Sequence, residues 1–302
     1  MAHDAHAGAD DQLAIPFVKM HAAGNDFVLL VALEECALPI EEQLWPQLAR
    51  DICARSFGVG ADGLLVVQPS RLAYVRMRMF NPDGTEDMCG NGLRCITRHL
   101  FDNYGAPDAF EVETIAGTKA VAVTTSRSRP PLVWVEMGEP KFSPRDIPAR
   151  TSEEHLLQRP LQVVDRSFTI SVVSVGTPHA VIVNHPALSD AEWARYSAAI
   201  ENHALFPERI SVTWVTVSAR DVVCARVWER AVGETLACGT GACAAVVVAA
   251  LHGLAERAAR VVFKGGDLFI EWRKDNQIVQ TGPAEEVYRG TYLWKPVARN
   301  AT

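Results

Sequence analysis

Two short segments carry the residue types best suited to chemistry. They are the tetrads Cys89–Gly92 (C-G-N-G) and Cys238–Gly241 (C-G-T-G), which lie about half of the 302-residue chain apart. Each precedes an apolar-rich segment that predicts a helix, 93–101 after the first and 242–251 after the second. This duplication predicts two similar halves, each presenting a thiol and unpaired backbone amides at a helix start.

A helix start favours bound anions, because its first amides are unpaired and carry partial positive charge. Glycines beside each thiol let a ligand approach the backbone closely. The amides of both tetrads are therefore expected to hold one carboxylate between them. The same positive helix ends are expected to lower the thiol pKa, so that Cys89 and Cys238 tend toward thiolate.

Two thiols that face one bound carboxylate suit proton transfer at the adjacent carbon. One thiolate removes a proton from one face of that carbon, and the other thiol returns a proton to the opposite face. The configuration is inverted with no redox change, while the amides stabilise the charge that moves onto the carboxylate. The tetrads therefore predict an inversion at carbon.

Other roles for the cysteines are weaker. A zinc site is not expected, because the chain has no Cys-x-x-Cys pair and the remaining spacings point the thiols apart along a helix. A disulfide between Cys89 and Cys238 stays open as an off-pathway oxidation product. The usual interpretation of a lone cysteine, a buried small apolar residue, applies to Cys36, Cys53, Cys95, Cys224 and Cys243.

The composition indicates a globular protein, with 48% hydrophobic and 22% charged residues. A net charge of −7 argues against nucleic acid as the main partner. No apolar run reaches the roughly 18 residues of a membrane span, so no membrane partner is expected. The start of the chain lacks the apolar stretch of a secretory signal, and the seven cysteines favour a reducing cytoplasm. Residues 1–14 are expected to form a flexible tail.

The elements that must position the tetrads can be predicted from apolar periodicity. Helices are expected at 41–57 and at 190–204, the latter with Ser189 as N-cap, and Gly105 is expected to end the helix that follows the first tetrad. The second tetrad helix is apolar nearly all round, which predicts burial on every side. Strands are expected at 17–20, 27–31, 64–67, 75–80, 110–115, 118–124, 132–137, 168–175, 180–183, 210–217, 222–228, 260–263, 267–272 and 277–281.

Two breaks divide this pattern. Residues 21–26 read as a polar turn between the first two strands, and the proline-bearing segment 126–131 reads as a domain boundary. Sheet-rich halves that each hold one notably apolar helix predict an α/β fold of the α+β type. In each half a curved mixed sheet wraps around a central helix.

With these residues in view, the chain resembles the diaminopimelate epimerase family along nearly its whole length. The two cysteine motifs together are highly specific, whereas either alone would be moderate support. The matching stretches are 19–21, 24–27, 55–63 (R-S-F-G-V-G-A-D-G), 80–95 (F-N-P-D-G-T-E-D-M-C-G-N-G-L-R-C), 176–179, 206–209, 228–243 (W-E-R-A-V-G-E-T-L-A-C-G-T-G-A-C) and 281–284.

The resemblance implies a cofactor-independent, two-base amino acid epimerase that interconverts L,L- and meso-diaminopimelate for lysine and peptidoglycan precursor synthesis. It also implies two similar domains with the active site in the cleft between them, and a C-terminal strand that returns to the first domain. The expected domains are 15–131 plus 284–302 and 132–283. A cytoplasmic homodimer acting on a small amino acid is expected, with no cofactor and no metal.

Site residues follow from the matched motifs. Cys89 and Cys238 would be the acid/base pair, and His179 and Glu229 would set the thiol protonation states, one near each cysteine. Asn25 would help to hold the reacting centre. The distal end of the substrate would contact Asn81, Glu229 and Arg230, and the reacting carboxylate would receive the amides of Gly90, Asn91, Gly239 and Thr240.

Simpler interpretations remain open for three of these residues. His179, which follows a proline, could only satisfy a loop. Arg230 could pair with Glu229 or Glu234 on the surface, and Asn25 could be only a turn residue.

The chain departs from the family pattern at two positions of the distal pocket. Thr177 and Ser211 stand where the family usually has asparagine, and Ala22 replaces a usual glycine. A hydroxyl keeps less hydrogen-bonding capacity than an amide, and a site built to bond one group discriminates strongly against another. The expected catalytic set is therefore intact, whereas the distal recognition is altered.

Two other functions stay open. The altered pocket favours a racemase of another amino acid, histidine being one candidate, on the same scaffold. A non-catalytic small-molecule binding protein is the alternative from a different class, and it predicts that Cys89→Ala and Cys238→Ala change no activity.

Overall fold

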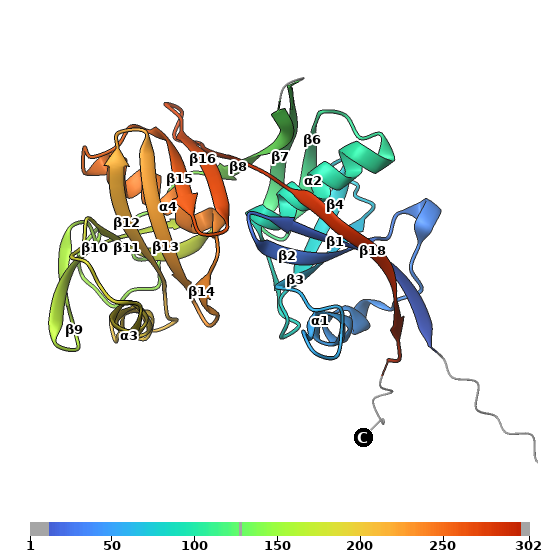
Figure 1. Cartoon of the computed structure of the whole chain (residues 1–302), viewed down its shortest axis with the longest axis horizontal. Coiled ribbons are helices and arrows are strands. Elements are labelled where there is room, and N and C mark those ends of the chain that lie inside the picture. Colours follow the sequence, from blue (N-terminus) through green and yellow to red (C-terminus); the bar gives the residue numbers. More distant parts are fainter. Residues whose placement is uncertain (1–11, 127–128, 297–302) are drawn as a thin grey trace, which may run out of the picture.

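The structure is a computed structural model that describes residues 12–126 and 129–296. These residues form two lobes joined by a narrow crossing (Figure 1). Residues 1–11 of the predicted tail lie outside the described part, but its last two residues are not a tail. Leu13 and Ala14 begin the first strand and pair with Trp294 and Leu293. Within the described residues, no helix is long and apolar enough to cross a membrane.

Two helices and eight strands make up the first half of the chain, and two short 3-10 turns, Glu34–Cys36 and Glu42–Leu44, precede its first helix. The elements are β1 (Leu13–Ala22), β2 (Asn25–Val31), α1 (Trp45–Cys53), β3 (Gly63–Gln68), β4 (Val75–Phe80), β5 (Glu86–Asp87), α2 (Gly90–Tyr104), β6 (Ala109–Thr114), β7 (Gly117–Ser126) and β8 (Arg129–Gly138).

The second half contains two more helices, and the final strand β18 returns to the first lobe (Figure 1). Its elements are β9 (Arg159–Val163), β10 (Arg166–Val175), β11 (Thr177–Val183), α3 (Asp190–Glu201), β12 (Ser211–Ala219), β13 (Val222–Glu229), β14 (Gly233–Thr235), α4 (Gly239–Leu251), β15 (Ala258–Phe263), β16 (Gly266–Trp272), β17 (Ile278–Gly282) and β18 (Glu285–Trp294).

The strand pairings repeat between the two halves. In the first, β1-β2-β3-β4-β6-β7-β8 pair in the order antiparallel, parallel, antiparallel, parallel, antiparallel, antiparallel. In the second, β10-β11-β12-β13-β15-β16-β17 pair in the same order. The tetrad helices α2 and α4 occupy equivalent places in this repeat. The two similar halves that the duplicated tetrads predicted therefore share the same strand topology.

The two halves join through their equivalent last strands, since β8 pairs antiparallel with β17. The break predicted at 126–131 lies partly outside the described residues, and on either side of it β7 and β8 pair antiparallel, with Ser126 opposite Arg129. One strand continues from 129 to 138 and pairs with both lobes. The predicted division at 131/132 therefore falls inside a strand, and the domain limits stay a prediction.

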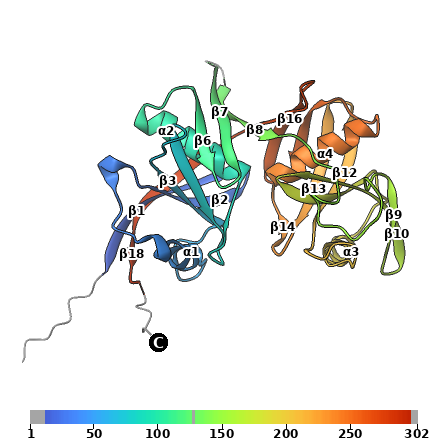
Figure 2. The ribbon, with the colours of Figure 1, turned by 180° about the vertical axis from the view of Figure 1, so that it is seen from behind.

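Each central helix is enclosed by strands of its own lobe (Figure 2). α4 is buried from Gly239 to Ala249 apart from Thr240, as its all-round apolar sequence predicts. α2 buries a mixed face that includes Arg94, Thr97 and His99. The smaller helices α1 and α3 cover the outer faces with separate apolar clusters. Each tetrad helix is thus packed against the strands of its own lobe.

Several predicted boundaries are corrected. The turn predicted at 21–26 is only the pair Ala23–Gly24, both with positive φ, because a two-residue hairpin turn of this kind matches the twist of its strands. Helices predicted at 41–57 and 190–204 are shorter, and both tetrad helices start within the tetrads themselves. Ser189 forms the predicted N-cap, as part of a capping box with Glu192, and Gly105 caps α2 in the left-handed region.

Candidate active site

Both tetrad cysteines are N-cap residues of the central helices. Cys89 precedes α2, and its Sγ accepts a hydrogen bond from the Gly92 amide at 3.4 Å. Cys238 precedes α4 in the equivalent extended conformation. The fourth residue of each tetrad must be small, because a Cβ on Gly92 would lie 2.7 Å from Leu65 and one on Gly241 would lie 2.9 Å from Val227. Glycine thus lets each helix start press against its own sheet.

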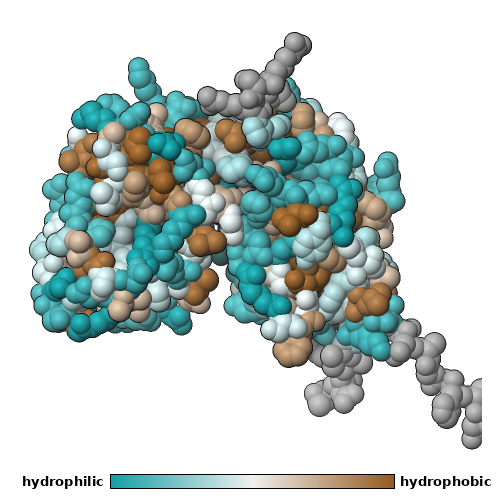
Figure 3. Space-filling model, viewed as in Figure 1, coloured by the Kyte–Doolittle hydropathy of each residue, from teal (hydrophilic) through white to brown (hydrophobic). Residues whose placement is uncertain are grey.

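The two helix starts meet although they come from different lobes. A Cβ on Gly239 of the second tetrad would lie 3.3 Å from the Asn91 Oδ1 of the first. The β10–β11 turn lies beside both, since a Cβ on Gly176 would be 3.5 Å from Met88 and 3.9 Å from Thr240. The surface between the lobes is notched on the face shown in Figure 3. The two helix starts therefore lie close together at the junction of the lobes.

The expected lowering of the thiol pKa is wrong for this structure. Burial raises the pKa of Cys89 to about 11, and it raises that of Cys238 well above its ordinary value. The nearby negative charge of Glu229 adds to both shifts, whereas backbone amides at each helix start oppose them. Loss of hydration outweighs the helix ends here, so both groups are thiols at neutral pH.

Cys238 lies at one end of a hydroxyl–imidazole chain. Its Sγ is 3.4 Å from the Thr240 Oγ1, which is 2.9 Å from the His179 Nε2, and the His179 Nδ1 is 2.9 Å from the Thr213 Oγ1. Burial and the positive charge of Arg230 lower the pKa of His179 to about 3, so its ring is neutral. His179 lies in strand β11 and is fully buried, which replaces the interpretation as a loop residue.

Glu229 ends strand β13 and also lies beside Cys238. It accepts a hydrogen bond from Thr235 Oγ1 at 2.5 Å, and burial raises its pKa despite hydrogen bonds from Thr235 and Cys238. The structure therefore brings both Glu229 and His179 to the Cys238 side. The Glu229 charge also acts on Cys89, so the assignment of one of these residues to each cysteine stays a prediction.

Arg230 does not form the surface ion pairs that its neighbours suggested. Its amide donates to the Ser211 Oγ at 3.1 Å, and its Nη1 lies 3.5 Å from the Glu208 carbonyl oxygen. Glu234 is engaged instead by Arg226 at 2.7 Å and by Lys264 at 3.0 Å. No described ion pair includes Arg230, which leaves its guanidinium available to a ligand.

Asn25 is more than a turn residue. Its Oδ1 accepts from the Asn91 Nδ2 at 2.9 Å and lies 4.0 Å from the Cys89 Sγ. Its Nδ2 donates to Asp62 at 2.7 Å, and Asp62 also pairs with Arg55 at 2.6 Å. Asp62, which fixes the orientation of the Asn25 amide, was matched in the 55–63 motif but received no role from the sequence.

The residues predicted for the distal pocket differ in where they lie and in what they contact. Ser211 is buried at the start of β12, and Thr177 begins β11 beside the turn that faces both tetrads. Asn81 follows β4 and donates to the Thr85 Oγ1 at 3.0 Å. The described hydrogen bonds join Asn81 to its own turn and not to either thiol.

Two buried polar side chains near the helix starts were not singled out from the sequence. They are Arg94 in α2 and Gln280 in β17, and Arg94 Nη1 donates to the Gln280 Oε1. Arg94 lies inside a matched motif, so a charged residue in a helix predicted to be apolar-rich was an available signal. Gln280 lies in a strand far along the chain, and only the β8–β17 junction brings it to the site.

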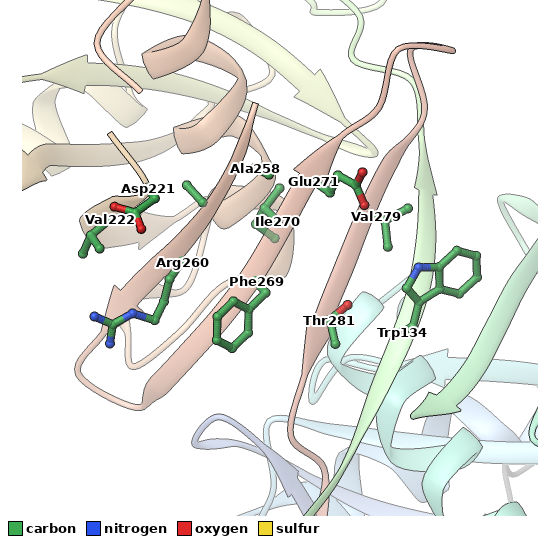
Figure 4. A pocket seen from close by; sticks show the side chains of 11 residues that line it. Trp134, Asp221, Val222, Ala258, Arg260, Phe269, Ile270, Glu271, Val279 and Thr281 are labelled. Atoms are coloured by element: carbon green, nitrogen blue, oxygen red, sulfur yellow. The ribbon is translucent and has the colours of Figure 1, made fainter. Parts of the chain in front are cut away.

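A separate hollow of about 440 Å³ lies on the outer face of the second lobe (Figure 4). Val279 and Thr281 line it, whereas Gln280 between them points to the opposite face of the strand, toward the helix starts. No predicted site residue lines it. The lining residues are Trp134, Asp221, Val222, Ala258, Ala259, Arg260, Phe269, Ile270, Glu271, Val279 and Thr281.

Solved structures share this fold at low sequence identity. A hydroxyproline epimerase from Agrobacterium vitis superposes with a TM-score of 0.69 at 11% identity, covering 95% of each chain. A Bacillus anthracis protein of the PhzF family of phenazine biosynthesis gives a TM-score of 0.66 at 18% identity, covering 92% of this chain and 99% of its own.

The duplicated fold, with a thiol at the start of each central helix, defines an isomerase of the type that works without pyridoxal phosphate. The chain belongs to the diaminopimelate epimerase family, whose sequence profile matches residues 17–143 and 171–287.

Two relatives named diaminopimelate epimerase show how close the match is. The protein of Desulfitobacterium hafniense is 41% identical over 278 residues, which cover 91% of this chain and 97% of the relative. The protein of Moorella thermoacetica is 43% identical over 279 residues, 91% and 98% of the two chains. The match thus spans nearly the whole of both proteins.

Proposed function

We propose that the protein interconverts L,L- and meso-diaminopimelate, with Cys89 and Cys238 acting on opposite faces of one α carbon. The observation that carries the mechanism is the meeting of two cysteine-capped helix starts from two lobes, where Asn91 approaches Gly239. The names and extent of the relatives support the substrate.

The reacting carboxylate would bind between the two helix starts. The amides of Gly90 and Asn91 on one side, and of Gly239 and Thr240 on the other, would donate to its oxygens. As the α proton leaves, negative charge moves onto this carboxylate, and fixed amide dipoles stabilise it without rearranging. The carboxylate would thereby place the α carbon between the two thiols.

One thiol must lose its proton before it can act as a base. Both thiols are protonated at neutral pH, because burial raises the pKa of each. The Glu229 carboxylate acts on the pKa of Cys238 by its charge and by direct interaction, so it would be placed to take the thiol proton when substrate binds. The α proton then moves to one sulfur, and the other thiol gives its proton to the opposite face.

The distal end of the substrate would contact Asn81, Glu229 and Arg230, with Thr177 and Ser211 nearby. The unpaired guanidinium of Arg230 would suit a second carboxylate. We further propose that the enzyme is a homodimer that works in the cytoplasm on its free amino acid substrate.

A racemase of another amino acid is the second candidate, and Ser211 favours it. The Ser211 hydroxyl is buried and already accepts the Arg230 amide at 3.1 Å. Less of its hydrogen-bonding capacity is left for a ligand than a family asparagine would offer. A shorter or differently shaped side chain could therefore occupy the distal pocket.

Hydrogen exchange in deuterated water separates the two candidates. The protein would be incubated with L,L-diaminopimelate and with a panel of L-amino acids that includes histidine, and α-deuterium would be measured by mass spectrometry. We expect deuterium in diaminopimelate together with the meso isomer. Exchange in another amino acid, with none in diaminopimelate, would overturn the first candidate in favour of the second.

A further inference from the structure

Arg94 is fully buried in α2, yet it pairs with no acid in the described part of the chain. Its Nη2 donates to the Asn91 Oδ1 at 2.7 Å, its Nε to the Pro283 carbonyl at 3.3 Å, and its Nη1 to the Gln280 Oε1. All three acceptors are neutral. A buried charge is costly to desolvate, and neutral acceptors return less of that cost than a carboxylate does.

Other buried cations of the described residues show what Arg94 lacks. Lys19 pairs with Asp26, and Arg78 pairs with Glu42 and Glu86. Of these three buried cations, only Arg94 has no carboxylate partner among the described residues.

The partners of Arg94 lie at both helix starts. Asn91 is the second residue of α2. Gln280 Nε2 is 2.7 Å from the Cβ position of Gly239, and its Oε1 is 3.4 Å from that of Gly90. The guanidinium therefore contacts the first tetrad directly, through Asn91, and is separated from the second by the Gln280 side chain. Both are regions where a bound carboxylate would meet the amides.

Only one half of the repeat provides this charge. Counting from the tetrad cysteines, the place of Arg94 in α2 is taken by Cys243 in α4, and Gln280 Nε2 lies 4.0 Å from its Sγ. The titratable groups around Arg94 are the thiols of Cys89, Cys95 and Cys243. Burial lowers its pKa to about 10, which keeps it charged at neutral pH. One cation is thus shared by two helix starts.

We propose that Arg94 is a positioning residue that holds an uncompensated positive charge behind both helix starts, for which the substrate α-carboxylate supplies the counter-charge. It acts through Asn91 and Gln280 and does not touch the reacting atoms. The inference rests on the proposed carboxylate site, but it concerns a feature that every α-amino acid carries.

Binding of L,L-diaminopimelate tests the charge directly. It would be measured by calorimetry in a Cys89→Ser background, so that the ligand is not converted. Arg94→Gln is expected to weaken binding roughly tenfold to hundredfold. An attraction of that size is expected between a carboxylate and a positive charge one side chain away, where water is partly excluded. Arg94→Lys should keep most of the affinity. Arg98→Gln, on the exposed side of the same helix where Arg98 pairs with Asp102, is the matched control and should bind as the background does.

A second variant keeps the test decisive if Arg94→Gln does not fold. Gln280→Glu places a carboxylate where Arg94 already donates, which should preserve the fold but neutralise the charge. We expect weaker ligand binding at unchanged or higher Tm. A purely structural role predicts normal binding instead, and normal binding by Gln280→Glu would overturn the proposal. So would an Arg94→Lys protein that folds but loses as much affinity as Arg94→Gln.

The design separates this inference from the proposed function. If the background protein does not bind diaminopimelate at all, the substrate assignment fails. The series is then measured with the amino acid that exchanged its α hydrogen, and the same outcomes decide the role of Arg94.

Discussion

The two helix starts share one backbone arrangement, an extended cysteine N-cap followed by glycine, but their surroundings differ. Cys89 contacts the Gly92 amide and lies 4.0 Å from an amide oxygen of Asn25. Cys238 lies beside Thr240 and Glu229, with His179 one hydrogen bond further away. The duplicated part is thus the helix start, whereas the groups that control the proton are gathered at the second one.

The helices behind the thiols differ in the same way. α2 buries a guanidinium, a hydroxyl and an imidazole, while α4 buries only small apolar and thiol side chains along its turns beyond the tetrad. The first lobe buries a guanidinium behind the helix starts, whereas the second places Glu229 and His179 on the Cys238 side. A symmetric scaffold can therefore hold two bases that do not have equal roles.

Removing either thiol is expected to have the largest effect. Cys89→Ala and Cys238→Ala should each lower the rate of inversion by about 10³-fold or more, because each face of the carbon needs its own proton handler. The measurement is the conversion of L,L- to meso-diaminopimelate, with deuterium uptake followed in parallel. Cys→Ser at either position should also lose most of the inversion. Full activity in either alanine variant would contradict the two-base mechanism.

Glu229 tests the asymmetry between the thiols. Its negative charge raises the pKa of both cysteines, and a direct interaction with the Cys238 thiol raises the pKa of that cysteine further. Glu229→Gln should therefore lower both thiol pKa values, with the larger fall at Cys238, and should slow inversion by roughly tenfold to hundredfold. Thiolate absorbance would be titrated in variants that keep one tetrad cysteine.

Glu234→Gln is the control for that titration. Its carboxylate is engaged by Arg226 and Lys264, so both thiol titrations should stay unchanged. If Glu229→Gln lowered the pKa of both cysteines equally, the result would contradict a difference between the two helix starts.

The second residues of the tetrads give a smaller, structural test. A Cβ on Gly239 would lie 2.7 Å from the Gln280 Nε2, and the Gln280 amide is held by Arg94. A Cβ on Gly90 would meet the flexible end of Met137 at 3.0 Å and would lie at an ordinary contact distance of 3.4 Å from the Gln280 Oε1. Gly239→Ala should lower the free energy of unfolding by about 1–3 kcal/mol and reduce kcat/KM, whereas Gly90→Ala should cost about 1 kcal/mol or less. Urea unfolding of both variants checks the order, and a reversed order would count against a fixed Gln280.

The smallest effect concerns pH. His179 has a pKa of about 3 in the folded protein against an ordinary value of 6.5. Below pH 6.5 the His179 side chain binds a proton in the unfolded chain but stays neutral in the folded protein. The free energy of unfolding therefore decreases as the pH falls toward 3. Between pH 7 and 5 this contributes a loss of about 2 kcal/mol. His179→Gln should show that much less loss in urea unfolding, and equal losses would mean that His179 is not held neutral.

Much of the fold could be predicted because the relevant signals are local. Alternating and apolar runs located most strands, and Ser189 and Gly105 marked helix ends through their own backbone preferences. The strand β9 was missed, since Arg159–Val163 mixes polar and apolar residues with a proline. The turn Ala23–Gly24 was predicted too long, because polar His21 and Asp26 lie in strands.

The site was less predictable where it depends on solvation and on distant pairing. The tetrads located Cys89 and Cys238, and the N-cap positions follow from their glycines. The direction of the thiol pKa shifts was wrong, since no sequence pattern measures how far a helix start is buried. Gln280 was missed, because its place is set by pairing of β17 with β8 across the two halves.

The pairing of β1 with β18 has a consequence for how the protein is made. Leu13 is translated long before its partner Trp294, which lies 294 − 13 = 281 residues further along the chain. The second lobe can therefore assemble around α4 during translation, while the first lobe waits with an open strand edge. Synthesis of β18 therefore determines when the first lobe can become complete.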